Sequence, residues 1–237
     1  MSFDMGQQPF TAIEKMDGGL RAYFGKIYNY MAGGLVVSGG MAYLASQEPF
    51  VNLFYTVTGY SVLGWIAILA PLFLIFAIGS SVRNLNAAKA QGFYWAFTAL
   101  MGVSLSNIFL FYPNIVIVQA LLTTAGMFAA VSLYGYTTGR SLASWGSFLF
   151  MGLIGVILAS IVNIFIGSSS LNWGLNVLCV FIFVGLTAYD TQKLKMMYRD
   201  YTDERTQQVL AVSGALSLYL DFINLFRLIL YFLNDRR

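Results

Sequence analysis

Two aspartates are the residues of this sequence best suited to chemistry, because both adjoin or interrupt apolar stretches. Asp221 lies in the middle of the apolar run 209–233, where Arg227 is the only other charged residue, and Asp190 directly follows the apolar run 171–189. An ionised carboxylate at the centre of a membrane-spanning helix costs about 2.5 kcal/mol or more. We therefore expect these carboxyl groups to serve a function, and the main question is what Asp221 meets.

If the two carboxyl groups lie within hydrogen-bonding distance, their expected chemistry is the sharing of a proton. Two carboxyl groups within hydrogen-bonding distance cannot both ionise cheaply, so they share one proton and titrate as a pair. Such a pair changes its charge near physiological pH without a histidine, and the sequence contains no histidine. The alternative is that each aspartate accepts hydrogen bonds from nearby Tyr, Asn or Arg side chains and only holds helices together.

The composition places both aspartates in an integral membrane protein. The 237 residues are 58% hydrophobic and 10% charged, whereas a soluble domain carries about 25% charged residues. We expect an all-α bundle of seven transmembrane helices, with residues 1–26 as a cytoplasmic N-terminal tail and residues 27–237 as the transmembrane domain. The apolar runs long enough to span, or nearly so, are 27–45, 60–79, 93–111, 115–136, 144–166, 171–189 and 209–233.

The placement of cations predicts the orientation of the bundle. The N-terminal tail and the loops after the second, fourth and sixth runs carry three, two, one and four Lys or Arg residues, ten in all on one side, and the opposite loops carry none. By the positive-inside rule the N-terminus is cytoplasmic. Seven crossings then place Arg236 and Arg237 outside, and the alternative is a last segment that re-enters and returns the C-terminus to the inside.

The two aspartates belong to helices that we expect to be antiparallel neighbours, because a short charged loop joins runs 171–189 and 209–233 on the cytoplasmic side. Their carboxyl groups could then approach each other in the inner half of the membrane. At 1.5 Å per residue the two groups would be offset by up to about 10 Å along the helices. Sliding of the long last helix by a few residues would close that offset, so the spacing permits the pair without establishing it.

Further polar residues adjoin or interrupt the apolar runs. Arg83 follows the second run on the cytoplasmic side, where its guanidinium could pair with Asp190, or could serve as an ordinary interfacial anchor. Four others could line a polar path, although hydrogen bonds between helices are their commoner role: Ser104, Asn107, Asn163 and Asn224.

Several classes of function are disfavoured by the residues present. The lack of histidine excludes histidine-based zinc sites and Ser-His-Asp triads. The single cysteine, Cys179, cannot form an internal disulfide, and we find no basic patch that would indicate nucleic acid. We expect no cofactor and no enzymatic activity; the enzymatic alternative is a membrane-embedded hydrolase with two catalytic aspartates.

Motifs around both aspartates resemble a known family. Segments 186–192 (LTAYDTQ) and 218–226 (LYLDFINLF) are similar to the last two helices of the Bax inhibitor-1, or transmembrane Bax inhibitor motif, family. Segments 128–136 (FAAVSLYGY) and 145–153 (WGSFLFMGL) resemble its fourth and fifth helices, and the brief tails resemble those of a bacterial member. The motif of the last helix is the most specific of these.

The resemblance implies a fold and an activity. The implied fold is seven helices with the last one in the centre, and the implied activity is a slow, pH-sensitive calcium leak across the cell inner membrane, opened by acid. Asp190 and Asp221 match the family's proton sensor and could bind calcium transiently, while Arg83 matches the arginine that latches onto the first aspartate. The expected partners are the lipid bilayer, calcium and protons, and other membrane proteins.

Two departures from the family pattern concern the ion path. Arg140 is followed by Ser141, where the family often has an acidic residue, and the second run contains no acidic residue. Two other functions stay open at this point. One is a regulatory protein that binds membrane partners, such as a quality-control protease, to modulate stress or cell survival. The other is a carrier that couples transport to protons through the two carboxylates.

Overall fold

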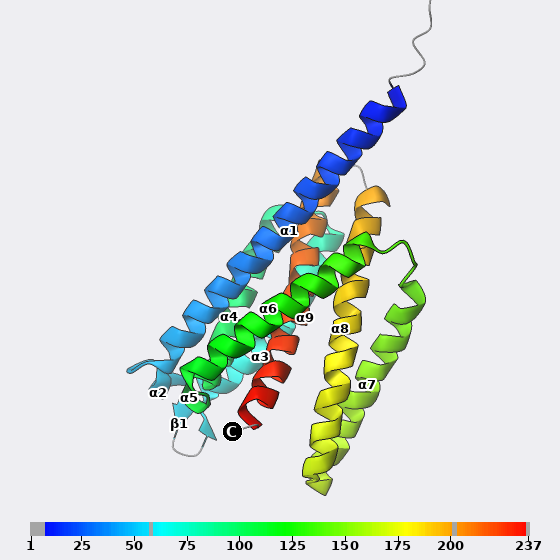
Figure 1. Ribbon diagram of the computed structural model, residues 1–237. Helices are drawn as coiled ribbons and strands as arrows, with labels where there is room; N and C mark the ends of the chain where they lie inside the picture. The colour runs from blue at the N-terminus through cyan, green and yellow to red at the C-terminus, as the bar shows by residue number, and fades with distance from the viewer. Residues whose placement is uncertain (1–7, 57–58, 201–202, 236–237) are drawn as a thin grey trace, which may run out of the picture.

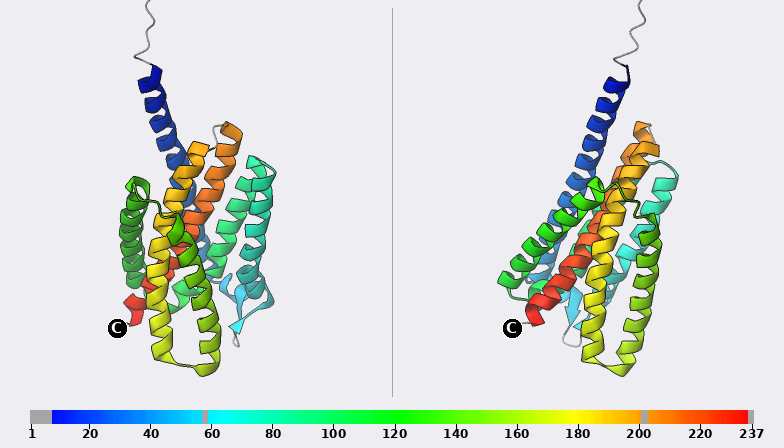
Figure 2. Two further views of the ribbon diagram at one scale, coloured as in Figure 1. Left: turned by 90° about the vertical axis from the view of Figure 1, so that its right-hand side faces the viewer. Right: turned by 45° about the vertical axis from the view of Figure 1, so that its right-hand side comes forward.

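Helices form almost all of this protein, as the apolar runs predict. The computed structural model (Figures 1 and 2) describes residues 8–56, 59–200 and 203–235, except for the side chains of residues 8–17, Asp200 and Asp235. The described elements in chain order are α1 (Gln8–Ser46), α2 (Val51–Phe54), β1 (Tyr55–Thr56), β2 (Gly59–Tyr60), α3 (Val62–Arg83), α4 (Ala87–Ser104), α5 (Asn107–Phe111), α6 (Asn114–Thr137), α7 (Ala143–Ile166), α8 (Ser169–Asp200) and α9 (Glu204–Asp235). β1 and β2 form a small antiparallel hairpin.

The last helix occupies the centre of the bundle, as the resemblance implies. α9 packs against α1, α4, α6 and α8, and most of its side chains are buried. The fully buried Tyr219 illustrates the packing: its hydroxyl lies 2.6 Å from the Ser38 hydroxyl of α1. Ser38 donates its own proton to the Thr98 carbonyl of α4 at 2.6 Å, so Tyr219 donates to Ser38 and the three helices are joined.

Six helices in the described part of the chain are long and apolar enough to cross a membrane; two of these spans are α8 and α9, and a third combines α4 with α5. The expected number of seven is therefore not confirmed. The one long described helix outside this group is α1, whose apolar half contains Gly33, Gly34, Gly39 and Gly40 in place of large apolar side chains. These glycines suit close packing of helices, and α1 packs along α4 and α9.

α1 is also longer than expected. It begins at Gln8 and extends to Ser46, so most of the segment expected as an N-terminal tail is part of this helix; residues 1–7 of that segment lie outside the described residues. Its 39 residues correspond to about 58 Å at 1.5 Å per residue, against about 30 Å of hydrocarbon in a bilayer. Figure 1 shows its first turns projecting beyond the neighbouring helices.

Three other features differ from the predicted runs. The run 93–111 is interrupted at Leu105 and Ser106, which separates α4 from α5. The run 171–189 continues as α8 to Asp200, so Asp190 lies within a helix instead of at its end. α9 is one continuous helix that finishes at the end of the bundle opposite to its start (Figure 1). It does not re-enter; Arg236 and Arg237 lie outside the described residues.

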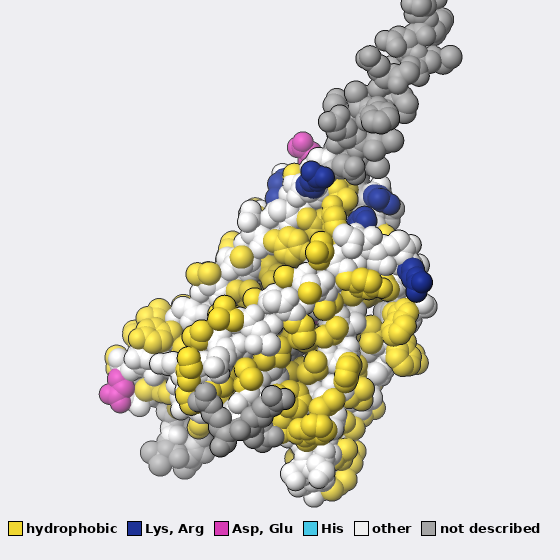
Figure 3. Space-filling model, viewed as in Figure 1, with side chains coloured by type: hydrophobic (Ala, Val, Ile, Leu, Met, Phe, Trp, Pro, Cys, Tyr) yellow, Lys and Arg dark blue, Asp and Glu magenta, His cyan; other side chains and the backbone are white. Residues whose placement is uncertain are grey.

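Charged residues gather at one end of the bundle. Arg21 and Lys26 in the first half of α1, and the Lys and Arg residues around the α3–α4, α6–α7 and α8–α9 loops, all lie at this end, where Figure 3 shows most of the visible basic side chains. The charged residues of the described part towards the opposite end are Glu48, Arg227 and Asp235, the last residue of α9. This distribution matches the one expected from the sequence, and the orientation inferred from it stays a prediction.

Candidate functional site

The interface between α8 and α9 brings Asp190 and Asp221 to neighbouring levels. The Ser217 hydroxyl of α9 donates to Asp190 Oδ2 of α8 at 2.9 Å. Asp221 follows Ser217 by four residues, so it lies on the same face of α9 one turn further on. Four residues correspond to about 6 Å along the helix, a smaller offset than the sequence suggested.

Asp221 lies in the interior of the bundle without full hydrogen bonding. Its side chain is 5% exposed, and its Oδ2 is buried with no hydrogen-bond partner among the described residues. An ionised carboxylate needs donors for both oxygens, and burying it without them costs far more than burying the neutral, protonated form. A buried polar group without a partner is costly, so the geometry suits a carboxyl group that carries a proton or passes it on.

The two carboxyl groups share the interface but not a hydrogen bond. Within residues 8–56, 59–200 and 203–235 the structure contains no hydrogen bond between Asp190 and Asp221, and Ser217 occupies one oxygen of Asp190. Proton sharing by the pair therefore stays a prediction. It requires α8 and α9 to slide past each other by about one helical turn, or a proton carrier between the two carboxyl groups.

The motif around Asp190 also fixes α8 against its other neighbours. Gln192 donates from Nε2 to the Arg140 carbonyl at 2.8 Å, and its Oε1 accepts from the Leu142 backbone at 2.7 Å. The Thr191 and Ser132 hydroxyls, on α8 and α6, are 3.0 Å apart. Sequence reasoning missed these roles, although the motif itself contained the signal: a threonine and a glutamine directly after the aspartate, turned to other faces of α8.

Arg83 is not paired with either aspartate among the described residues. It is the last residue of α3 and is exposed, and it forms no ion pair with either aspartate in the described parts of the chain. α3 packs against α4 and α9, while Asp190 lies on α8 with Ser217 of α9 as its partner. The expected latch is therefore absent from this arrangement of the helices.

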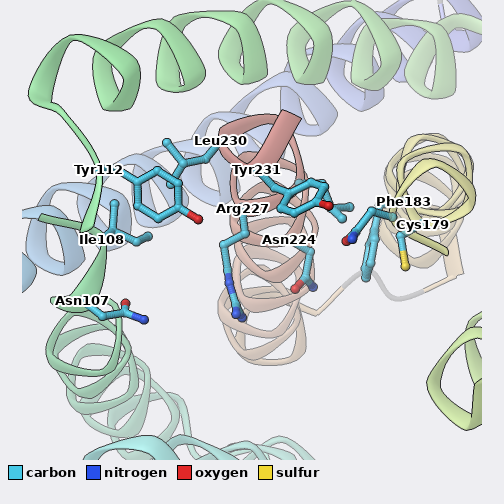
Figure 4. A pocket seen from close by; sticks show the side chains of 11 residues that line it. Asn107, Ile108, Tyr112, Cys179, Phe183, Asn224, Arg227, Leu230 and Tyr231 are labelled. Carbon is cyan, nitrogen blue, oxygen red and sulfur yellow. The ribbon is translucent and has the colours of Figure 1, made fainter. Parts of the chain in front are cut away.

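A pocket of about 340 Å³ occupies the opposite half of the same interface (Figure 4). Two residues of the expected polar path line it, Asn107 at the start of α5 and Asn224 on α9. Sequence reasoning missed the other members of the pocket, although α8 offers a signal in its polar and apolar residues at intervals of three and four. Those other lining residues are Ile108, Tyr112, Asn176, Cys179, Phe183, Arg227, Leu228, Leu230 and Tyr231.

The remaining path residues lie elsewhere. The Ser104 hydroxyl donates to the Met101 carbonyl of its own helix at 2.9 Å. Asn163 closes the turn after α7, where its side chain donates to the Ser168 carbonyl and accepts from the Ser168 backbone, both at 3.1 Å. Gly167 permits this turn because its φ of 70° is left-handed. The structure thus brings two of the four residues together.

The described residues contain no group of three or more His, Cys, Asp or Glu side chains that could hold a metal ion. Calcium usually takes six to eight oxygen ligands, and the α8–α9 interface offers two carboxyl groups. Two carboxyl groups suit brief contact with a passing cation better than stable binding of a resident cation.

Comparisons with known proteins cover nearly the whole chain. Residues 20–237 match the family described as Inhibitor of apoptosis-promoting Bax1. The chain is 43% identical over 229 residues to an uncharacterized protein of Caulobacter vibrioides, covering 94% of this chain and 92% of that protein. It is 40% identical over 228 residues to Inner membrane protein YbhL of Escherichia coli (strain K12), covering 95% and 97%. An uncharacterized membrane protein of Streptococcus pyogenes serotype M1 is 36% identical over 210 residues, covering 89% and 91%.

Proposed function

Since this chain belongs to the Bax inhibitor-1 family of multi-pass membrane proteins, we propose that it is a pH-sensitive calcium leak of the cell inner membrane, gated by Asp190 and Asp221. The observation that carries the proposal is the buried Oδ2 of Asp221, which has no hydrogen-bond partner among the described residues. It lies one turn from the hydrogen bond between Asp190 and Ser217, in the central helix of the bundle.

The direction of the pH response follows from this hydrogen bond. A hydrogen bond to an ionised carboxylate is roughly twice as strong as one between neutral groups. At alkaline pH an ionised Asp190 holds Ser217 and keeps α8 against α9. As pH falls and the pair takes up protons, that bond weakens and α8 can separate from α9. Protonation thus shifts a two-state equilibrium towards the open form, and acid increases the leak.

The ion path in this proposal follows the α8–α9 interface. Asp190 and Asp221 are the carboxyl groups within the described candidate spans away from their ends, and carboxylate oxygens are ligands that calcium prefers. Calcium is the transported ion here, and no cofactor is required.

A flux assay with purified protein tests the proposal. Protein in vesicles loaded with calcium should leak faster as pH falls, because the pair binds protons. Asp190→Asn and Asp221→Asn remove the titrating groups while keeping similar shape, so each should flatten the pH dependence. Glu48→Gln is the matched control, since Glu48 is an exposed acid in a loop, and it should leave the response unchanged.

Each alternative outcome has a definite reading. Absence of flux at every pH would contradict the leak and favour a protein that regulates membrane partners. Flux with a pH dependence that survives both substitutions would retain the leak and exclude the aspartate pair as its sensor. Arg83→Ala tests the latch separately. If Arg83 latches onto Asp190 in another state, the variant should leak more than the unchanged protein at alkaline pH. If Arg83 is only an exposed anchor, the variant should leak no more than the unchanged protein.

A further inference from the structure

The pocket beside Arg227 holds hydrogen-bond donors that have no partner among the described residues. Among the described residues, the side chains of Asn107, Asn224 and Arg227 line this pocket without any hydrogen-bond or ion-pair partner. Figure 4 shows Arg227 and Asn224 leaving α9 towards the same space, with Asn107 facing them from α5 and Phe183 and Cys179 of α8 on the other side. A guanidinium and two amides therefore converge on one volume.

The charge of the pocket selects an anion. Among the described residues that line it, Arg227 is the only charged one and none is acidic. Glu48 and Asp235 also lie towards this end of the bundle. Glu48 is not part of the lining, and the side chain of Asp235 is outside the described part of the structure. A calcium ion requires oxygen ligands and favours negative charge, so this pocket is unsuited to a resident cation.

The donors match an oxyanion. A guanidinium presents N–H groups in a planar fork that fits carboxylate and phosphate oxygens, and asparagine amides donate two further N–H groups each. Asn172 of α8 donates to the Tyr231 hydroxyl at 3.3 Å, which leaves the Tyr231 proton available as another donor. The volume of about 340 Å³ lies at the small end of ligand pockets, about 300–1,000 Å³.

We propose that this pocket between α5, α8 and α9 binds a small oxyanion, a carboxylate or a phosphate group, through Arg227, Asn224 and Asn107. The group belongs either to a free solute on this side of the membrane or to a lipid head group, because both present the same oxygens. This site is independent of the proposed calcium leak and of Asp190 and Asp221.

Titration of purified protein tests binding of the free anion. The probes are inorganic phosphate and acetate, added to protein in an uncharged detergent against sodium chloride of equal ionic strength, with the thermal unfolding midpoint as the readout. Each probe should raise the midpoint in a saturable way that chloride does not reproduce. Arg227→Gln should weaken binding by about tenfold or more, since a hydrogen bond to a charged group is lost. Asn224→Ala should weaken it by a smaller factor.

Arg140→Gln is the matched control, because Arg140 is also an exposed arginine but lies in the loop at the other end of the bundle. It should bind the probes like the unchanged protein. The lipid arm measures phospholipid retained by the protein during purification: a bound head group predicts retention that Arg227→Gln lowers and Arg140→Gln keeps.

The two arms separate the sources of the anion. Saturable binding of phosphate or acetate that depends on Arg227 supports a free oxyanion, and retained lipid that depends on Arg227 supports a head group. If neither probe binds and lipid retention is the same in all variants, the proposal is overturned. Equal effects of Arg227→Gln and Arg140→Gln would also overturn it, because they would reflect general electrostatics.

Discussion

Helices α7 and α9 are both apolar enough to cross a membrane, but they have opposite surroundings. α7 contains no charged residue, yet its buried residues are only Gly146, Leu149 and Val156. α9 contains Asp221 and Arg227 within its span, yet it lies in the centre and is mostly buried. Figures 1 and 2 show α7 at the edge of the bundle, beside α8.

The contrast shows which sequence signal reports burial in a membrane protein. Lipid chains are as apolar as a leucine side chain, so an apolar face gains little by facing protein instead of lipid. Polar and ionisable groups are costly in lipid and face the interior of the bundle. The more polar of two membrane-spanning helices is therefore the better candidate for the centre, the reverse of the rule for soluble proteins.

The largest expected effect tests the lipid-facing side of α7. Ile157 lies near the middle of this helix and is 51% exposed. Ile157→Asp would place a carboxylate in the hydrocarbon region, at a cost of about 3 kcal/mol, so we expect much less protein inserted in the membrane. The measurement is the inserted fraction in membranes, with Ile157→Ala as the control. Normal insertion of Ile157→Asp would show that this face of α7 does not meet lipid.

A smaller effect compares a tightly packed position of α6 with an open position of the same helix. A Cβ on Gly135 of α6 would collide with the backbone of Ala188 on α8, whereas a Cβ on Gly126 of the same helix would meet nothing within 4 Å. Gly135→Ala should lower stability by about 2 kcal/mol because the two backbones must separate. Gly126→Ala should be neutral or stabilising by about 0.5 kcal/mol.

Thermal unfolding in detergent measures both substitutions. Equal midpoints for the two variants would show that α6 and α8 do not approach as closely as the structure describes. The pair is informative because both changes add the same methyl group to the same helix.

The smallest effect contrasts Asp221 with an acid at the exposed start of its helix. Asp203 precedes α9 and its Oδ1 accepts from the Thr206 backbone at 2.8 Å. Hydrogen bonding from the Thr206 side chain, and to a lesser extent from its backbone N–H, lowers the pKa of Asp203 from its usual value. Because the folded pKa is below the unfolded one, the ionised carboxylate stabilises the start of α9 above the unfolded pKa, and this stabilisation is lost as pH falls through the folded pKa.

Hydrogen exchange in the first turn of α9 measures this effect. Protection should decrease slightly in acid in the unchanged protein, and Asp203→Asn should remove the pH dependence while keeping an acceptor at the same position. A pH dependence that persists in Asp203→Asn would assign the effect to another group.

The positions of most helices could be predicted because length and apolar character are local properties. Runs 60–79, 115–136 and 144–166 correspond closely to α3, α6 and α7. The interruption at Leu105 and Ser106 could not be predicted, because both residues belong to an apolar run and the break depends on packing around α4 and α5. The hairpin of β1 and β2 was missed for a similar reason, since its strands have two residues each.

The candidate site could be predicted only as a set of residues. Asp190 and Asp221 stood out because charge is rare in apolar runs, but their relative depth depended on the length of α8, which continues beyond the apolar residues. The partner of Asp190 is Ser217, a residue without any signal of its own. Arg83 ends a helix that packs on α4 and α9, and no local pattern encodes which helices become neighbours.

The length of α1 has a mechanical consequence. A rigid rod that is embedded along one part of its length and free at the other acts as a lever arm. The embedded part lies against α4 and α9, so a sideways force on the free part would be transmitted as torque to the central helix. A molecule that binds the projecting turns of α1 could thereby shift the arrangement of the helices from outside the membrane, without entering the protein.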